Sequence, residues 1–152
     1  MRWMLWCAAF AAVASCGRGG GGGGGENDTE AFRPLDVGAP VPAYAALTLE
    51  GDTVRVGGAS AGTPTVLNVW ATWCTSCREE MSALDSLRRE FKERGLRVVA
   101  VSVDGGNVER VRRFAASNHL GMVVAHDPEG SIERSFQVVG VPTTFVIDRA
   151  GK

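Results

Sequence analysis

Two cysteines, Cys74 and Cys77, follow directly on an apolar run at residues 66–71. Such a run is typical of a buried strand, and the residues after Cys77 have helical spacing. Cys74 should therefore lie at the N-terminus of a helix, with Cys77 one turn further along. The unpaired N–H groups and the dipole at a helix N-terminus favour a thiolate. Because the thiolate is the reactive form, we predict that Cys74 attacks and Cys77 resolves, as thiol–disulfide exchange requires.

The other cysteines favour a local redox pair. Cys7 and Cys16 both lie in the N-terminal segment, which leaves no distant partner for a structural disulfide in the rest of the chain. The pair could also be half of a zinc site, but such a site needs four ligands. The two histidines, His119 and His126, lie at the ends of separate predicted elements and neither is predicted to be catalytic.

The domain that carries the pair is predicted to be α/β. Strand-like and helix-like segments alternate, which indicates a central sheet. The net charge of −1 gives no indication of a nucleic-acid surface. Residues 104–107 are predicted to form a turn and a helix N-cap. The expected strands are 44–49, 53–56, 66–71, 96–103, 122–125 and 143–147, and the expected helices are 77–94, 107–118 and 131–136.

Residues 1–15 have the features of an export signal. Arg2 supplies the positive charge, and the apolar residues 3–14 are too few to span a bilayer as a mature helix. Residues 13–16, Val-Ala-Ser-Cys, resemble a bacterial lipobox, in which the cysteine becomes diacylated. We therefore expect a lipoprotein anchored through Cys16, since two fatty chains give stable anchoring.

Two alternatives to the lipobox stay open. Cleavage after Ala14, at a small-x-small site, would release a soluble protein with a free Cys16. A mis-assigned start would leave a cytoplasmic protein. Either export route places the cysteine pair outside the cytoplasm.

Residues 16–36 are predicted to form a tether. They contain seven consecutive glycines followed by a polar stretch, and cannot bury apolar surface. As a coil, the tether reaches roughly 20–25 Å over residues 17–33. It would hold the folded domain, residues 37–152, away from a membrane, or it is a tract without a role.

Several separated motifs resemble the thioredoxin superfamily, and most of all the membrane-tethered TlpA/ResA-like thiol–disulfide oxidoreductases. The resemblance implies a thioredoxin fold with an N-terminal β-hairpin and an inserted strand–helix unit. Members of that family continue past the turn at residues 148–151 into an edge strand and a closing helix. We therefore expect one sheet edge without its usual cover, and a domain of marginal stability. The matching stretches are residues 37–40, 66–81, 98–104 and 140–148.

The resemblance also implies roles for individual residues. Cys74 would be the nucleophile and Cys77 the resolving sulfur, with Trp73 flanking them. Val141 and Pro142 would be joined by a cis peptide bond beside the pair, which an X–Pro bond allows. The Val141 backbone would then pair with an extended segment of the substrate.

Glu80 matches a family glutamate that tunes the thiols. A carboxylate near a thiol raises its pKa and can relay its proton. Alternatively, Glu79 and Glu80 only complement the helix N-terminus. Asn68 stands where ordinary thioredoxins have a buried aspartate, and Ser76 and Ser82 stand where prolines are common. These differences affect the expected redox potential rather than the chemistry.

The sequence therefore predicts an extracytoplasmic, lipid-anchored thiol–disulfide oxidoreductase, most simply a reductase of specific protein disulfides. It needs no diffusible cofactor. The resemblance implies a membrane electron donor, and apocytochrome c, in cytochrome c maturation, as a substrate. Two alternatives stay open: a thiol peroxidase, which would place a lone cysteine in a Thr- and Pro-containing loop, and a copper-binding module.

Overall fold

The computed structural model describes residues 34–58, 62–106 and 108–152. Its elements follow the predicted order, with boundaries that differ by at most three residues. The helices are α1 (Thr75–Phe91), α2 (Glu109–Ser117) and α3 (Ser131–Ser135), with a 3-10 turn η2 (Lys92–Arg94) after α1. The strands are β1 (Tyr44–Thr48), β2 (Thr53–Val56), β3 (Thr65–Trp70), β4 (Arg97–Ser102), β5 (Val123–His126) and β6 (Thr143–Ile147).

The strands described by the structure form one mixed sheet in the order β2-β1-β5-β4-β3-β6. β3, β4 and β5 are parallel, whereas β1 pairs antiparallel with β5 and β6 pairs antiparallel with β3. β1 and β2 form the predicted hairpin. α2 and β5, between β4 and α3 in the chain, are the predicted insertion. The α/β thioredoxin-fold prediction is therefore confirmed.

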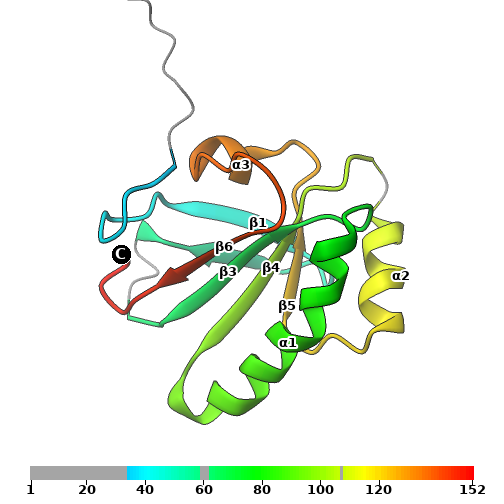
Figure 1. Cartoon of the computed structure of the whole chain (residues 1–152), viewed down its shortest axis with the longest axis horizontal. Coiled ribbons are helices and arrows are strands. Elements are labelled where there is room, and N and C mark those ends of the chain that lie inside the picture. Colours follow the sequence, from blue (N-terminus) through cyan, green and yellow to red (C-terminus); the bar gives the residue numbers. More distant parts are fainter. Residues whose placement is uncertain (1–33, 59–61, 107) are drawn as a thin grey trace, which may run out of the picture.

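Helices cover both faces of the sheet, as Figure 1 shows. α1 and α2 pack on one face, where Met81 and Val111 meet Trp70 of β3. α3 packs on the other face, where Ile132 and the neighbouring Phe136 meet alternate residues of β3 and β4. Every residue of β3 is buried, because this central strand is covered on both sides. The strand that leads into the cysteine pair is thus the most firmly packed in the sheet.

β6 forms an edge of the described sheet. It pairs with β3, and no strand in the part of the chain that the structure describes pairs with its other side. The Val146 side chain is 78% exposed there. The predicted open edge therefore lies at β6. No helix in residues 34–58, 62–106 or 108–152 is long and apolar enough to cross a bilayer.

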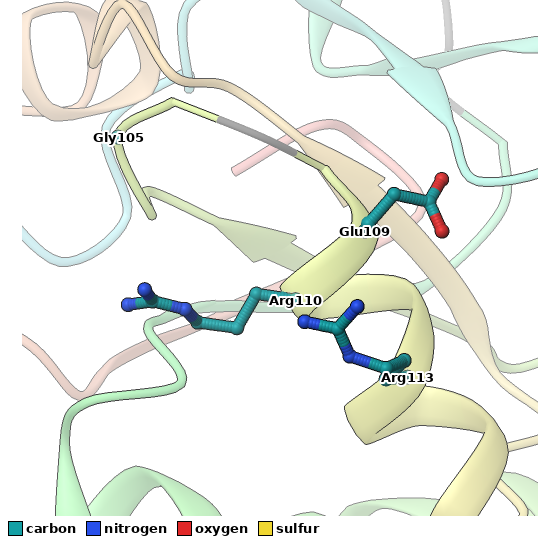
Figure 2. Close-up of a pocket in the computed structure, with 4 residues that line it drawn as sticks. All are labelled: Gly105, Glu109, Arg110 and Arg113. Atoms are coloured by element: carbon teal, nitrogen blue, oxygen red, sulfur yellow. The ribbon is translucent and has the colours of Figure 1, made fainter.

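α2 begins differently from the prediction. Val108 occupies its N-cap position and makes no side-chain cap hydrogen bond, and Asn107 lies outside the described residues. A small pocket at this helix start is lined by Gly105, Glu109, Arg110 and Arg113, and Figure 2 shows Glu109 and Arg110 extending in opposite directions. The pocket contains neither cysteine of the pair.

Asp127 anchors α3 to the hairpin. Its carboxylate accepts hydrogen bonds from Tyr44 Oη at 3.1 Å, Ser131 Oγ at 2.8 Å and the Ile132 amide at 2.7 Å. Burial alone would raise the pKa of Asp127, but the bonds from Ile132 and Ser131 outweigh it, so the pKa is lowered. Burial and the adjacent carboxylate raise the pKa of Tyr44.

Asp127→Ala should destabilise the protein by about 2–3 kcal/mol at pH 7, because it leaves buried donors unpaired. A carboxylate with a lowered folded-state pKa stabilises above its unfolded pKa of about 3.9, and this contribution is lost as the pH falls through the folded value. Urea unfolding should therefore show the gap between wild type and Asp127→Ala narrowing between about pH 5 and pH 2. The exposed Asp52→Ala should stay within about 0.5 kcal/mol of wild type. A gap that does not change with pH would contradict this account.

Candidate active site

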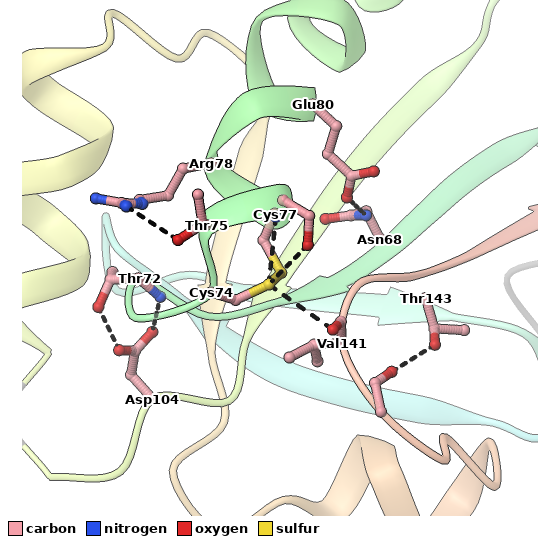
Figure 3. The surroundings of a disulfide bond; sticks show 12 residues. Asn68, Thr72, Cys74, Thr75, Cys77, Arg78, Glu80, Asp104, Val141 and Thr143 are labelled. Atoms are coloured by element: carbon pink, nitrogen blue, oxygen red, sulfur yellow. Dashed lines mark hydrogen bonds between the residues drawn. A yellow bond between two sulfur atoms is a disulfide. The ribbon is translucent and has the colours of Figure 1, made fainter.

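Cys74 and Cys77 form a disulfide at the start of α1, with their Cα atoms 5.3 Å apart. Cys74 is the N-cap residue of α1 and has extended backbone dihedrals. Its sulfur accepts a hydrogen bond from the Cys77 amide at 3.2 Å. The predicted placement at a helix N-terminus is confirmed, and Figure 3 shows the pair between α1 and the segment that leads to β6.

The two sulfurs differ in accessibility. Cys74 is 8% exposed, whereas Cys77 is fully buried. Of the two residues, Cys74 is therefore the one that presents surface to an incoming thiol or disulfide. This asymmetry favours the predicted roles, Cys74 as the attacking and Cys77 as the resolving sulfur, and those roles stay predictions.

The surroundings of Cys74 suit a thiolate. The first turn of α1 carries no acidic residue, so no carboxylate within that turn offsets the positive end of the helix dipole. Ser76 Oγ lies 3.5 Å from Cys74 Sγ and can donate to it. Ser76 stood out in the sequence only because a proline is common at that position, and this contact was not predicted. The signal for it was that a hydroxyl in the first turn of a helix can face the N-cap residue.

The Val141–Pro142 peptide bond is cis, as the resemblance predicted. The Val141 carbonyl oxygen lies 3.7 Å from Cys74 Sγ. In the disulfide that sulfur has no proton, so this is a packing contact, and a reduced Cys74 thiol could donate to the same oxygen. The Val141 amide has no backbone partner among the described residues. It is therefore available to an extended chain that approaches Cys74.

The two tryptophans beside the pair occupy different environments. Trp73 is 64% exposed next to Cys74. Trp70 is fully buried and packs against Phe114 of α2, with ring centroids 5.1 Å apart. Trp73 thus adds an exposed apolar surface to the rim around Cys74, while Trp70 belongs to the core.

Glu80 is held by a polar residue of the sheet. Asn68 Nδ2 donates to Glu80 Oε1 at 2.7 Å and to Thr144 Oγ1 at 3.0 Å. Asn68 Oδ1 is buried and has no hydrogen-bond partner among the described residues. Neither cysteine sulfur is hydrogen-bonded to Glu80 in the described structure. The sequence placed Glu80 correctly on α1 but did not predict Asn68 as its partner. The available signal was the strand alternation, which puts Asn68 on the same face of β3 as Trp70, the face that α1 covers.

Asp104 serves a purpose that the sequence did not predict. Its carboxylate accepts hydrogen bonds from the Thr72 amide at 2.8 Å, Thr72 Oγ1 at 2.5 Å and Ser102 Oγ at 2.7 Å. It therefore joins the end of β4 to the segment before Cys74. His126 Nε2 lies 2.8 Å from the Asp104 carbonyl oxygen.

Metal-ligand groups of three or more His, Cys, Asp or Glu residues are absent from the described residues. His126 Nε2 is within hydrogen-bond distance of the Asp104 carbonyl oxygen. His119 is exposed just after α2 and has a φ of 50°. Neither histidine lies among the groups that contact the cysteines. The predicted lipidation site, Cys16, lies outside the described residues.

Residues 37–152 match the AhpC/TSA family. Among curated proteins, the chain is 31% identical over 118 residues to thiol-disulfide oxidoreductase ResA of Bacillus thuringiensis subsp. konkukian, covering 78% of this chain and 67% of the relative. It is 34% identical over 119 residues to the thioredoxin-like protein YneN of Bacillus subtilis, covering 77% and 68%.

A solved structure agrees with these relatives. It is that of a putative thiol:disulfide interchange protein DsbE from Chlorobium tepidum. The TM-score is 0.71 at 34% identity, over 78% of this chain and 82% of that one. The family match spans most of the chain and includes both cysteines, so the protein belongs to the thioredoxin-like AhpC/TSA family.

Proposed function

We propose that this protein is an extracytoplasmic thiol–disulfide oxidoreductase that reduces disulfides of specific proteins through Cys74 and Cys77. The observation that carries the proposal is the asymmetry of the pair: Cys74, at the start of α1, keeps 8% of its surface exposed, and Cys77 has none exposed. The named activities of ResA and DsbE support the same chemistry.

The reaction begins from the dithiol form. The Cys74 thiolate attacks one sulfur of a substrate disulfide, and the other substrate sulfur leaves as a thiolate and takes up a proton. Cys77 then loses its proton, attacks Cys74 Sγ and releases the second substrate sulfur, which is protonated in turn. Two electrons and two protons pass to the substrate, and the Cys74–Cys77 disulfide of the structure is the product.

Substrate binding is proposed at Trp73 and Val141. Trp73 offers exposed apolar surface beside Cys74, and the free Val141 amide offers a hydrogen-bond donor to an extended chain. Main-chain pairing of this kind binds a peptide largely irrespective of its side chains. Pro142 fixes the backbone next to that donor, because its ring restricts φ.

Glu80 is proposed as the group that tunes the thiols and relays the proton lost by Cys77. It follows Cys77 by one turn of α1, and a hydrogen bond from Asn68 of β3 fixes its carboxylate. A negative charge near a thiol opposes its ionisation. Glu79 is exposed and makes no such contact with the sheet, so we assign it no part in catalysis.

Glu80→Gln should lower the pKa of the Cys74 thiol by roughly one unit, because the opposing charge is removed. The pH dependence of iodoacetamide alkylation of the reduced protein measures that pKa. Glu79→Gln is the matched control and should leave the alkylation profile unchanged. An unchanged profile in Glu80→Gln, or an equal shift in both variants, would contradict the role of Glu80.

The proposed cellular arrangement rests on the sequence. Residues 1–15 would be removed, Cys16 would carry the lipid and residues 16–36 would form the tether. An oxidising compartment returns the pair to the disulfide, so a membrane electron donor must reduce it again. The disulfide of apocytochrome c, reduced to thiols before haem attachment, is the candidate substrate, through the resemblance to the TlpA/ResA-like proteins.

Catalysed reduction of insulin disulfides, with dithiothreitol as the electron source, tests the proposed activity. Wild type should accelerate the reaction above dithiothreitol alone, and Cys74→Ser should not. Hydrogen peroxide offered in place of insulin separates this activity from that of a thiol peroxidase. Peroxide consumption without insulin reduction would overturn the proposal.

A further inference from the structure

We propose that Asp104 is a positioning residue that fixes the segment from Thr72 to Cys74 and thereby sets the reactivity of the Cys74 thiol. The inference deepens the proposed function, since it concerns the same cysteine. Asp104 lies just past the carboxyl end of β4, directly after Val103, and the hydrogen bonds of its carboxylate and amide go to Thr72 and Ser102 rather than to either cysteine. It acts through Thr72, two residues before Cys74 in the chain.

The contact is built from buried polar groups. Asp104 is 2% exposed, and one carboxylate oxygen accepts from both the Thr72 amide and Ser102 Oγ while the other accepts from Thr72 Oγ1. Figure 3 shows the two dashed lines that join Thr72 to Asp104 beside Cys74. A carboxylate bound by three donors makes stronger hydrogen bonds than a neutral acceptor would.

Thr72 depends on Asp104 for its hydrogen bonds. Both bonds that its amide and hydroxyl donate go to that carboxylate, and none joins it to another described residue. The next residue, Trp73, is mostly exposed and adds little packing. Between the end of β3 and the N-cap at Cys74, the chain is held by the Asp104 carboxylate, by the burial of Ala71 and by the backbone hydrogen bond that the Cys74 amide donates to the Ala71 carbonyl oxygen at 3.2 Å. The Asp104 carboxylate is the side-chain restraint on Thr72.

Asp104 is itself held from the rigid part of the sheet. Its backbone amide donates a hydrogen bond to Ser102 Oγ at 3.1 Å, which ties it to the last residue of β4. Its carbonyl oxygen is 2.8 Å from His126 Nε2 on β5. The position of Thr72 is thus fixed relative to the ends of the parallel strands β4 and β5, and not relative to the exposed residues that follow Asp104.

The consequence for Cys74 is geometric. The Cys77 amide reaches Cys74 Sγ only while the N-cap backbone keeps its extended conformation. A shift of about 1 Å in a reacting group can lower a rate by as much as 10²-fold. Loosening Thr72 should therefore weaken the hydrogen bond to the thiolate, raise the thiol pKa and slow exchange.

Thr72→Val tests the inference with the smallest change, since it removes the hydroxyl donor and keeps the amide. We expect Cys74 alkylation at pH 7 to slow about three- to tenfold, with the midpoint of its pH profile moved upward. Asp104→Ala, which removes every bond, should slow it more than tenfold. Thr65→Val is the matched control, because buried Thr65 begins β3, at the end of that strand remote from Cys74. It should keep the wild-type profile even if the melting temperature falls.

Asp104→Asn separates hydrogen bonding from charge. Its amide oxygen can accept from the Thr72 amide while its NH₂ group donates to the Thr72 hydroxyl, which can also accept. The alkylation rate should stay within about threefold of wild type. A variant as slow as Asp104→Ala would show that charge, not position, matters and would overturn the inference.

Alkylation needs no substrate protein, so this test is independent of the proposed reductase activity. Failure of wild type to reduce insulin would count against the proposed function alone. A Thr72→Val profile indistinguishable from wild type, in a protein with wild-type circular dichroism, would overturn the inference even if Asp104→Ala does not fold.

Discussion

Cys77→Ser should accumulate covalent complexes with extracytoplasmic proteins, whereas Cys74→Ser should accumulate none. Without the resolving sulfur, the mixed disulfide formed at Cys74 persists until an external thiol attacks it. The buried Cys77 cannot form such a complex by itself, because a substrate does not reach its sulfur. The complexes are measured by non-reducing electrophoresis of extracts from cells in which acid has stopped thiol exchange and the free thiols have then been alkylated.

The comparison between the two serine variants is its own control, because each removes one sulfur from the same disulfide. Complexes should disappear on treatment with dithiothreitol, and their partners can be identified by mass spectrometry. Equal trapping by both variants would reverse or remove the assigned roles. Absence of trapping by both, in cells shown to contain the proteins, would contradict the exchange mechanism.

Cys16→Ala should move the protein from the membrane fraction to the soluble fraction and abolish palmitate labelling. Each buried methylene contributes about 0.8 kcal/mol to membrane binding, so loss of two acyl chains removes the anchor entirely. Cys7→Ala is the matched control, since Cys7 lies in the segment expected to be removed. It should keep both the label and the membrane location.

The opposite result has a definite form. Soluble wild-type protein with Ser15 as its first residue would establish cleavage after Ala14. The lipobox interpretation of residues 13–16 would then be wrong. The redox chemistry of Cys74 and Cys77 would be unaffected, because it depends only on the folded domain.

The periodic part of the fold was predictable because local patterns decide it. The continuous apolar character of residues 66–71 and the three-and-four spacing after Cys77 reflect burial on two faces for β3 and on one face for α1. The N-cap position of Cys74 followed from the junction between those patterns. Boundaries shifted by up to three residues; the predicted helix at 107–118, for example, is observed as α2 at Glu109–Ser117.

The polar contacts around the site were not predictable in the same way. Asn68 meets Glu80, and Asp104 meets Thr72, across 12 and 32 residues of chain. Such pairs form only when the tertiary fold brings separate segments together, and no local spacing encodes that. Aspartate followed by glycines is common in turns, so the sequence pattern predicted a turn at Asp104. It gave no indication that the Asp104 carboxylate holds the segment before Cys74.

The reduction potential of the Cys74–Cys77 pair tests the central claim, that this protein is a reductase, most directly. Equilibration of the protein with buffers of defined dithiothreitol potential, followed by counting of alkylated thiols, gives the value. We expect a single two-electron transition in the reducing range, below about −200 mV and toward the ~−270 mV of thioredoxin. A value near the ~−120 mV of a strong periplasmic oxidant would contradict the account, because such a pair would donate disulfides instead of reducing them.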